Sequence, residues 1–333
     1  MKNLVSIIIP VYNVADFIIP CLSSVAEQSY YHIEVIIVDD CGTDNSMQLV
    51  EQFISNYKGS IKFRIFKHSR NTGLSAARNT GTAHAAGQYI YYLDSDDMLT
   101  PDTIKNLLEK AEETDADMIC GEYCFVGGED IFDGHMNLTS DEVIIQGTQN
   151  ILEALCRRQY FITAWNKLIK TDFLKKSGIS FIEGLLFEDD PWSVELAYKL
   201  NKIVLLNKKT YQYVYRKTSI LNELNLKKKL TSIEKLVRIN FELASQHPEF
   251  KNNKYLYECC VNKLLNYIQF AYENFDDDVL FNCLQSIETF QYDSKYFSVF
   301  AKGLHGSHRM LMMMYHLPKW FRPFFYKLMK KNK

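Results

Sequence analysis

Residues 5–13 read Val-Ser-Ile-Ile-Ile-Pro-Val-Tyr-Asn, and residues 33–40 read Ile-Glu-Val-Ile-Ile-Val-Asp-Asp. Short runs of branched apolar residues, such as 5–9 and 35–38, are typical of strands that are covered on both faces. Further strand-like runs lie at 63–66, 89–93 and 118–120, and helix-like segments separate the five. This alternation of strand and helix up to about residue 125 predicts an α/β fold with a doubly wound, mostly parallel sheet.

The helices expected between these strands have recognisable ends. One spans residues 15–28, and a second follows Asp44 or Asn45, either of which can cap it. A third spans 75–86 and ends at Gly87. Pro101 is expected at the first position of a fourth helix, where its missing N–H costs nothing.

The pattern changes after residue 125. Residues 126–148 are rich in Gly and Asp and are expected to form a long loop, whereas 150–220 are mixed. Residues 230–243 and 255–270 have helical periodicity. We therefore place a boundary near residue 220, with an α/β domain over 1–220 and a helical C-terminal region over 221–333.

The composition excludes several classes of protein. Apolar residues make up 47% of the 333, and the formal net charge of −2 gives no global attraction to nucleic acid. The eight cysteines show no CxxC spacing, so we interpret them as reduced thiols in a cytoplasmic protein. No run reaches the ~18 apolar residues of a membrane span, and the first apolar run is too short for a signal peptide.

Ligands of open α/β sheets bind beyond the carboxyl ends of the strands. The first strand ends in Tyr12-Asn13, a bulky turn that suits a base or ribose, and neither GxGxxG nor Gly-Lys-Ser/Thr is present. The second strand ends in Asp39-Asp40, whose carboxylates can accept hydrogen bonds from a base or a ribose hydroxyl. A purely structural role, capping the next helix, is the alternative for this pair.

The strand at 89–93 ends in an acidic turn, Asp94-Ser95-Asp96-Asp97. Three carboxylates in four residues repel one another at neutral pH, and a hard divalent cation is the usual reason for such a cluster. An Asp-x-Asp pair can bind Mg²⁺ or Mn²⁺ and leave positions open for a diphosphate. The alternative is a solvated acidic turn in front of a helix.

These motifs together resemble the family 2 glycosyltransferases, which have the GT-A fold. The resemblance is carried by residues 6–13, 36–46, 71–81 and 92–97, whose order and spacing fit the family. It is firm over about 3–125 and looser over 160–220. One departure is Cys41-Gly42, where the family often has Gly-Ser, and we expect Gly42 to permit the same turn. The resemblance divides the first domain into a nucleotide-sugar part, 1–125, and an acceptor part, 126–220.

The resemblance implies roles for individual residues. The nucleotide-sugar site would comprise Pro10, Tyr12, Asn13, Asp39, Asp40, Arg78, Asp94, Ser95 and Arg216. Asp94 and Asp96 would hold Mn²⁺ or Mg²⁺, with Asp96 the firmest ligand. Arg216 could clamp the donor diphosphate through bidentate contacts, or it could be an ordinary surface arginine.

The segment Phe187-Glu188-Asp189-Asp190-Pro191-Trp192 resembles the Glu-Asp motif of the same family. Inverting transfer needs a base that takes the proton from the acceptor hydroxyl. By position in the motif we choose Asp189, with Glu188 as the second candidate. The alternative is that these acids cap the helix that starts near Pro191. The acceptor would be contacted by Trp165, Asp190 and Trp192, although Trp165 would suit a protein core almost as well.

The C-terminal tail has a biased composition. From Ser294 onward there are nine Lys and Arg and no Asp or Glu, interleaved with Met and aromatic residues. This pattern suits a helix that lies in a membrane interface beside anionic lipids. The alternative is a C-terminal helix docked on the protein itself.

These inferences predict an inverting glycosyltransferase of the EC 2.4 class, a hexosyl- or N-acetylhexosaminyltransferase. It would transfer a sugar from a UDP-sugar to a lipid-linked saccharide in capsule, O-antigen or exopolysaccharide synthesis. The protein would be cytoplasmic and peripheral at the inner face of the cell membrane, without nucleic-acid partners. Two alternatives stay open at this point: a metal-dependent nucleotidyltransferase and a catalytically inactive saccharide-binding module.

Overall fold

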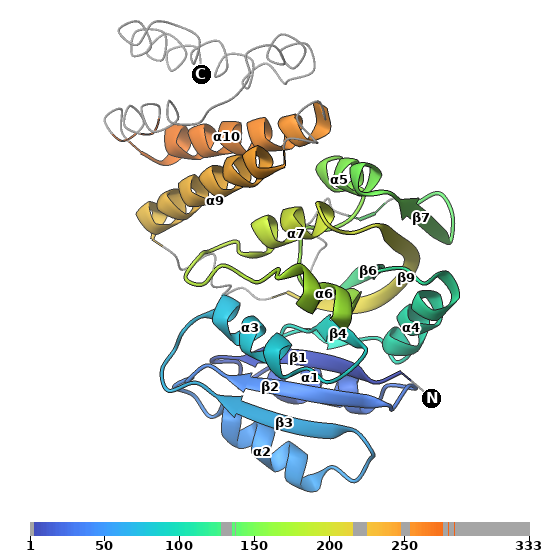
Figure 1. Cartoon of the computed structure of the whole chain (residues 1–333). Helices are drawn as coiled ribbons and strands as arrows, with labels where there is room; N and C mark the ends of the chain where they lie inside the picture. Colours follow the sequence, from blue (N-terminus) through green and yellow to red (C-terminus); the bar gives the residue numbers. More distant parts are fainter. Residues whose placement is uncertain are drawn as a thin grey trace, which may run out of the picture. The chain divides into compact units, whose positions relative to one another are not determined.

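The computed structural model describes residues 3–127, 135–136, 138–215, 225–247, 254–275, 279 and 283 (Figure 1). The contacts divide the chain into two compact units, Met1–Ser219 and Ile220–Lys333. The first unit holds every strand of the sheet.

The first unit is built on a nine-stranded sheet of order β3-β2-β1-β4-β8-β6-β9-β5, with β7 paired to β9. Strands β1 (Val5–Val11), β2 (Ile33–Asp39), β3 (Lys62–Lys67) and β4 (Tyr89–Tyr92) form its parallel half. These are four of the five predicted strands, and all seven residues of β1 and of β2 are buried. The predicted α/β class with a mostly parallel sheet is therefore confirmed for this half.

Different helices cover the two faces of the parallel half. Ile7 and Ile9 belong to a core cluster that includes buried side chains of α1 (Ile18–Ala26), α2 (Ser46–Asn56) and α4 (Thr103–Thr114). Ile8 points to the other face, toward α3 (Leu74–His84). A Cβ added at Gly81 would lie 2.3 Å from Ile8 Cγ2, so α3 can approach the sheet this closely only with glycine there.

The other half of the sheet differs from the prediction. Strand β6 (Met118–Val126) was expected to continue the parallel order, but β8 (Lys167–Lys170) lies between β4 and β6 and is antiparallel to both. Residues 126–148, expected as a loop, contain β7 (Glu142–Gln146), which pairs with β9 (Lys202–Val214). The remaining elements are β5 (Met98–Leu99), α5 (Thr148–Cys156), α6 (Thr171–Ser177) and α7 (Asp189–Ala197).

One predicted helix start is wrong, and the structure decides between the two cap residues predicted for another helix. Helix α4 begins at Thr103, so Pro101 lies in the preceding turn and not at the first helical position. Asn45 is the N-cap residue of α2 but makes no side-chain capping bond. Asp44 takes that part, because its carboxylate accepts from the backbone N–H and the hydroxyl of Ser46 at 3.0 and 2.6 Å.

The described part of the second unit consists of α9 (Leu226–Gln246) and α10 (Lys254–Asn274), as the periodicity predicts. Asn225 caps α9 by accepting from the N–H of Lys227 at 2.8 Å. Lys263 on α10 donates to the side chain of Asn240 on α9 at 3.0 Å. None of the helices that the structure describes is long and apolar enough to cross a bilayer. The basic tail from Ser294 lies outside the described residues.

Candidate functional site

Strand β1 pairs in parallel with both β2 and β4, so the loops that follow these three strands lie at one edge of the sheet. Tyr12 follows β1 and is 40% exposed. Pro10 is a buried residue of β1. Asn13 has a φ of 51°, and its side-chain oxygen accepts from the N–H groups of Thr43 and Asp44 at 2.7 and 3.3 Å. Asn13 therefore holds the loop after β2 in place, in addition to any role toward a nucleotide.

The turn after β2 uses a different left-handed residue from the one expected. Cys41 has a φ of 57°, whereas Gly42 is outside the left-handed region. Gly42 is needed for space instead, because a Cβ there would lie 2.9 Å from the Asn13 side-chain oxygen. The turn survives the Cys-Gly departure, but for this steric reason and not through the backbone freedom of Gly42.

Asp40 is 3% exposed and ties the segment 68–73 to the end of β2. Its carboxylate accepts from the N–H of Thr72 and the N–H of Gly73, both at 2.8 Å, and from the Thr72 hydroxyl at 2.9 Å. It also lies 2.7 Å from His68 Nδ1. Burial alone would raise the pKa of this carboxyl, but these hydrogen bonds outweigh burial and lower the pKa. Asp40 thus has a structural role, but at the start of α3 and not as the considered cap of the next helix, α2, and a contact with nucleotide stays a prediction.

Asp39 is 4% exposed, and its carboxylate accepts from the N–H of Cys41 at 2.9 Å. Its other oxygen lies 3.4 Å from Lys67 Nζ. Asp39 therefore stabilises the turn that follows its own strand. This carboxylate is engaged in local contacts. It would have to keep these contacts while it also contacts the nucleotide, as predicted.

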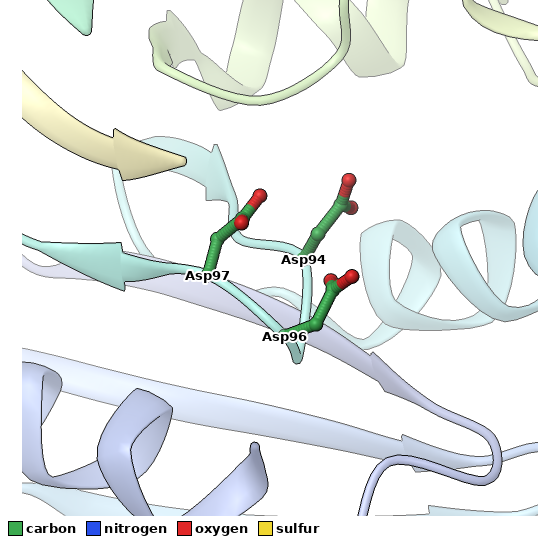
Figure 2. Close-up of side chains that lie close together, drawn as sticks. All are labelled: Asp94, Asp96 and Asp97. Carbon is green, nitrogen blue, oxygen red and sulfur yellow. The ribbon is translucent and has the colours of Figure 1, made fainter. Parts of the chain in front are cut away.

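The acidic turn after β4 brings three carboxylates together, as Figure 2 shows. Oxygen atoms of Asp94, Asp96 and Asp97 all lie within 4.8 Å of one another. Asp97 is 2% exposed and accepts from the Tyr211 hydroxyl at 2.6 Å and the N–H of Val214 at 2.8 Å. Burial, with a smaller effect of Asp94, raises the pKa of Asp97 to about 8. Asp97 is thus tied to β9, and Asp94 and Asp96 are the two less buried acids.

This donor set fits a hard divalent cation. Carboxylate oxygens are the ligands that Mg²⁺ prefers, and it binds through one or two of them while keeping positions for phosphate. Asp94 and Asp96 supply such a pair, whereas both oxygens of Asp97 are already used by β9. Ser95, between them, is 6% exposed.

Arg78 on α3 connects the acidic turn to the Glu-Asp motif. Its side chain is 1% exposed, and Nη2 donates to Asp94 at 2.8 Å. Nη1 donates to Glu188 at 2.8 Å and to Asp189 at 2.7 Å. Burial would lower the pKa of Arg78, but Asp189, Asp94 and Glu188 outweigh it and raise the pKa. One guanidinium thus holds the first metal-motif residue and both candidate bases.

The two candidate bases differ in access. The Asp189 side chain is 23% exposed and that of Glu188 is 11% exposed. Burial raises the pKa of Glu188 to about 7, with Asp189 adding to the rise and Arg78 opposing it. Burial also raises the pKa of Asp189, against the opposing effect of Arg78. Glu188 is the N-cap residue of α7 and makes no side-chain capping bond, whereas Asp189 lies in the first turn of α7, as the helix-start alternative expects.

The residues predicted for the acceptor are mostly covered. Trp165 is 8% exposed and stacks on Tyr211 with ring centroids 4.4 Å apart. Trp192 is 2% exposed and stacks on Phe181 at 4.6 Å. Both indoles pack against protein rings in this structure, so neither offers an open face to a sugar. Asp190 is 8% exposed, and Arg216 lies outside the described residues.

Several residues that were not predicted from the sequence organise the site. Tyr211 ties Asp97 to β9, and Thr72 and Gly73 hold Asp40. Thr72 and Gly73 lie within a segment that carried the family resemblance, so a role could have been assigned to them. Lys167, within Ala164-Trp165-Asn166-Lys167-Leu168, is completely buried, and nothing in the local sequence indicates that.

The sequence of this chain is similar to those of known proteins. The model of the family "Glycosyl transferase family 2" matches residues 6–178, just over half of the chain. "Glycosyltransferase GlyA" of Streptococcus pneumoniae serotype 4 is 33% identical over 223 residues, 65% of this chain but 31% of that protein. The Escherichia coli K12 protein YibD, an uncharacterized glycosyltransferase, is 29% identical over 224 residues, 66% of this chain and 63% of YibD. The chain thus spans less than two thirds of the length of these two relatives.

The fold is shared with a solved structure. The crystal structure of S. aureus TarS 1–349 in complex with UDP-GlcNAc superposes with a TM-score of 0.75 at 19% sequence identity. The match covers 99% of this chain and 91% of that one. At this level of identity the similarity establishes the fold, and it confirms the predicted GT-A-type architecture.

Proposed function

Because this chain belongs to glycosyl transferase family 2, we propose that it transfers a sugar from a nucleotide-sugar donor to a saccharide acceptor, with inversion at the anomeric carbon. The proposal rests on the Arg78 cluster, which consists of Arg78 and the three carboxylates that it contacts, Asp94, Glu188 and Asp189. It places an Asp-x-Asp turn suited to a metal-bound diphosphate beside a partly exposed carboxylate suited to proton transfer. A binding module without catalysis would need neither the partly exposed base nor its link to the acidic turn.

We propose UDP-sugar as the donor and Mn²⁺ or Mg²⁺ as the cofactor. The similar fold of TarS is known in complex with UDP-GlcNAc, which supports a uridine nucleotide. A mannosyltransferase from Pyrobaculum calidifontis with a TM-score of 0.55 and 16% identity is known in complex with GDP-Man and Mn²⁺. Asp94 and Asp96 would hold the cation, which when bound neutralises charge on the departing diphosphate. Tyr12, Asp39 and Asp40 would border the nucleotide.

The reaction uses the chain's own residues as follows. Asp189 takes the proton from the acceptor hydroxyl while the hydroxyl oxygen attacks the anomeric carbon of the donor. The bond from that carbon to the nucleoside diphosphate breaks, and the diphosphate leaves with the electron pair. Arg78 keeps Asp189 oriented through its 2.7 Å hydrogen bond, so the base is already in place when the acceptor binds.

For the acceptor we propose a lipid-linked saccharide of surface-polysaccharide synthesis. The support is the basic and aromatic composition of the tail, which would bring the enzyme to an anionic membrane surface. No observation on the described residues favours a nucleotidyltransferase over this function.

A donor panel tests the proposal. The full chain would be incubated with UDP-, GDP- and dTDP-sugars, with Mn²⁺ or with EDTA, and free nucleoside diphosphate would be measured. We expect release from a UDP-sugar that depends on metal and is abolished in the Asp96→Ala variant, with the fold checked by circular dichroism. Full release in EDTA would contradict the metal assignment. A product that retains the anomeric configuration of the donor would contradict inversion.

A further inference from the structure

His68, the residue that follows β3, is held by both its backbone and its ring. Its N–H donates to the carbonyl of Asp39 at 2.9 Å, and its own carbonyl accepts from Cys41 Sγ at 2.8 Å. Only 13% of its side chain is exposed. His68 takes no direct part in the proposed transfer, yet its ring lies beside Asp40, which would border the nucleotide.

The two ring nitrogens of His68 join two elements of the fold. Nδ1 lies 2.7 Å from Asp40 Oδ1, just after β2, and Nε2 lies 2.9 Å from the hydroxyl of Thr80 on α3. An ionised carboxylate can only accept hydrogen bonds, so Nδ1 is the nitrogen that carries a proton and donates to Asp40. In a neutral ring, Nε2 then accepts from the Thr80 hydroxyl, and both nitrogens have a partner.

The hydrogen bonds of Asp40 are shared unequally between its two oxygens. Oδ1 accepts from His68, from the N–H of Thr72 at 2.8 Å and from the Thr72 hydroxyl at 2.9 Å. Among the described residues, Oδ2 accepts from the N–H of Gly73 alone, at 2.8 Å. A carboxylate offers about four acceptor sites, roughly two on each oxygen. Oδ1 is therefore saturated, and the acceptor site that is left for a ligand belongs to Oδ2.

Helix α3 is tied to the Asp40 carboxylate at two points. Asp40 accepts from the N–H of Gly73, the N-cap residue of α3, and His68 contacts the hydroxyl of Thr80 further along the helix. Arg78, which contacts both acids of the Glu-Asp motif, lies between these two points on the helix. The contacts from Asp40 through His68 to Thr80 therefore connect the nucleotide side of the site to the helix that orients the base.

We propose that His68 is a positioning residue of the nucleotide site. Through Nδ1 it holds Asp40 so that Oδ2 is the single acceptor for the donor nucleotide, and through Nε2 it ties Asp40 to Thr80 on α3. The inference rests on the proposed function in one respect, the place of the donor nucleotide beside Asp40. One acceptor site takes one N–H or O–H of a base or ribose, and His68 acts on that contact only through Asp40.

The position of the ring proton can be measured on the unmodified protein, without any activity. The full chain with ¹⁵N-labelled histidine would be recorded at pH 8, where the shifts of the two ring nitrogens distinguish the tautomers, and assigned with the His68→Asn variant. We expect a proton on Nδ1 of His68, whether or not Nε2 carries a second one. A proton on Nε2 alone would overturn the proposal, because Nδ1 would then accept from the Thr72 hydroxyl, 2.6 Å away, and could not donate to Asp40.

Matched variants separate the donated proton from the size of the ring. The side-chain nitrogen of Asn lies close to the place of Nδ1, so His68→Asn can still donate to Asp40, whereas His68→Leu cannot. UDP affinity, measured by calorimetry with Mn²⁺, should fall about tenfold or more in His68→Leu and stay within about threefold in His68→Asn. His84→Leu, at an exposed position of the same helix, is the control. Equal losses in the Asn and Leu variants, or no loss in His68→Leu, would overturn the proposal.

The tie to α3 has its own variant. Thr80→Val removes the hydroxyl at almost the same size, and UDP affinity should fall less than in His68→Leu. Combining Thr80→Val with His68→Leu should add no further loss, because the hydroxyl acts through the ring. Additive losses would overturn the proposal. If the unmodified chain binds no UDP, the proposed donor is wrong, while the ring spectra still decide whether His68 holds Asp40.

Discussion

At the residue scale, Asp189 and Glu188 share Arg78 and yet differ in what they can do. Asp189→Asn keeps the size of the side chain and an oxygen that can accept from Arg78, but it cannot take a proton. We expect turnover to fall ~10²–10⁴-fold, the usual contribution of a positioned base. UDP binding, measured by calorimetry, should be retained.

Glu188→Gln is the matched control for that experiment, since it removes the neighbouring carboxylate at almost the same place. Its turnover should fall much less than that of Asp189→Asn. If Glu188→Gln is the inactive variant and Asp189→Asn transfers normally, Glu188 is the base and the assignment is reversed.

A second residue-scale prediction concerns Glu34, a 5% exposed carboxylate within β2. It accepts from the Ser6 hydroxyl at 2.6 Å, the N–H of Ala86 at 2.7 Å and Arg64 at 3.1 Å. Burial alone would raise the pKa of Glu34, but these hydrogen bonds outweigh it and lower the pKa below its usual value of 4.5. A lowered pKa stabilises the fold above the unfolded value, and this stabilisation is lost as pH falls through the folded value.

Glu34→Gln should therefore destabilise the protein by about 1.5–3 kcal/mol at pH 7, the range for a hydrogen bond to a charged group. The difference from the unmodified protein should shrink as pH falls below 4.5 and through the lowered pKa of Glu34. Urea unfolding at pH 7 and at a series of lower pH values measures this difference in stability, with the exposed Glu113→Gln variant as control. A difference that is constant with pH would contradict the assignment.

At the scale of elements, two consecutive residues of α3 hold the segment that carries the base. Arg78 contacts Glu188 and Asp189, and Asn79 makes two hydrogen bonds to the backbone of Phe181. The Asn79 amide donates to the Phe181 carbonyl at 2.8 Å, and its oxygen accepts from the Phe181 N–H at 2.9 Å. The Arg78 guanidinium in turn lies over the Phe181 ring, with Arg78 Cζ 5.2 Å from the ring centroid.

Asn79→Ala should loosen this segment while leaving the nucleotide side of the sheet intact. We expect turnover to fall roughly tenfold to a hundredfold, because small displacements of a catalytic group carry costs of that size. UDP affinity should stay within about twofold, which binding and steady-state kinetics would show together. Asn56→Ala, at the exposed end of α2, is the control. Equal losses of UDP affinity and turnover would mean that Asn79 supports the whole fold instead.

The elements that the sequence predicted are those with strong local signals. Buried runs such as 35–38 and helices with clear amphipathic faces were placed correctly, because burial on both faces leaves a mark on every residue of the run. Strand β8 has only four residues, Lys-Leu-Ile-Lys, and its place between β4 and β6 depends on pairing with residues far away in sequence. Within the residues that the structure describes, strand β7 pairs only with β9, and its burial is partial, so its pattern resembles a loop.

The same limit applies to the site. The Asp-x-Asp turn and the Glu-Asp motif could be recognised because each is contiguous. The link that Arg78 makes between the two motifs could not be predicted, because its partners lie 16, 110 and 111 residues away along the chain. The tie between Asp97 and Tyr211 spans 114 residues and likewise has no local signature.

At the scale of the whole molecule, charge is distributed unevenly along the chain. The described site concentrates carboxylates around Arg78, whereas the chain from Ser294 to its end carries nine basic residues and no acidic ones. The nearly neutral net charge of −2 thus hides a strong separation between an acidic site and a basic tail. A helix that merely packs on its own protein would not need that bias.

The last prediction follows from this separation. Each Lys or Arg near an anionic leaflet contributes roughly 1 kcal/mol, and Trp320 and Tyr326 suit the level of the lipid headgroups. Pro318 and Pro323 would divide the segment into short pieces, so it should lie on the membrane and not cross it. We expect the full chain to pellet with anionic vesicles at low salt, and less at high salt or with neutral lipid, because salt screens the attraction.

A chain that ends at residue 304 should remain in the supernatant under the same conditions. Its transfer to a small soluble acceptor should persist, while transfer to a lipid-linked acceptor should fall, since only the latter reaction depends on recruitment. A variant with Trp320→Ala and the basic charges kept separates the aromatic contribution from the electrostatic one. If the full chain fails to pellet with anionic vesicles at low salt, the tail serves another purpose and the membrane assignment is wrong.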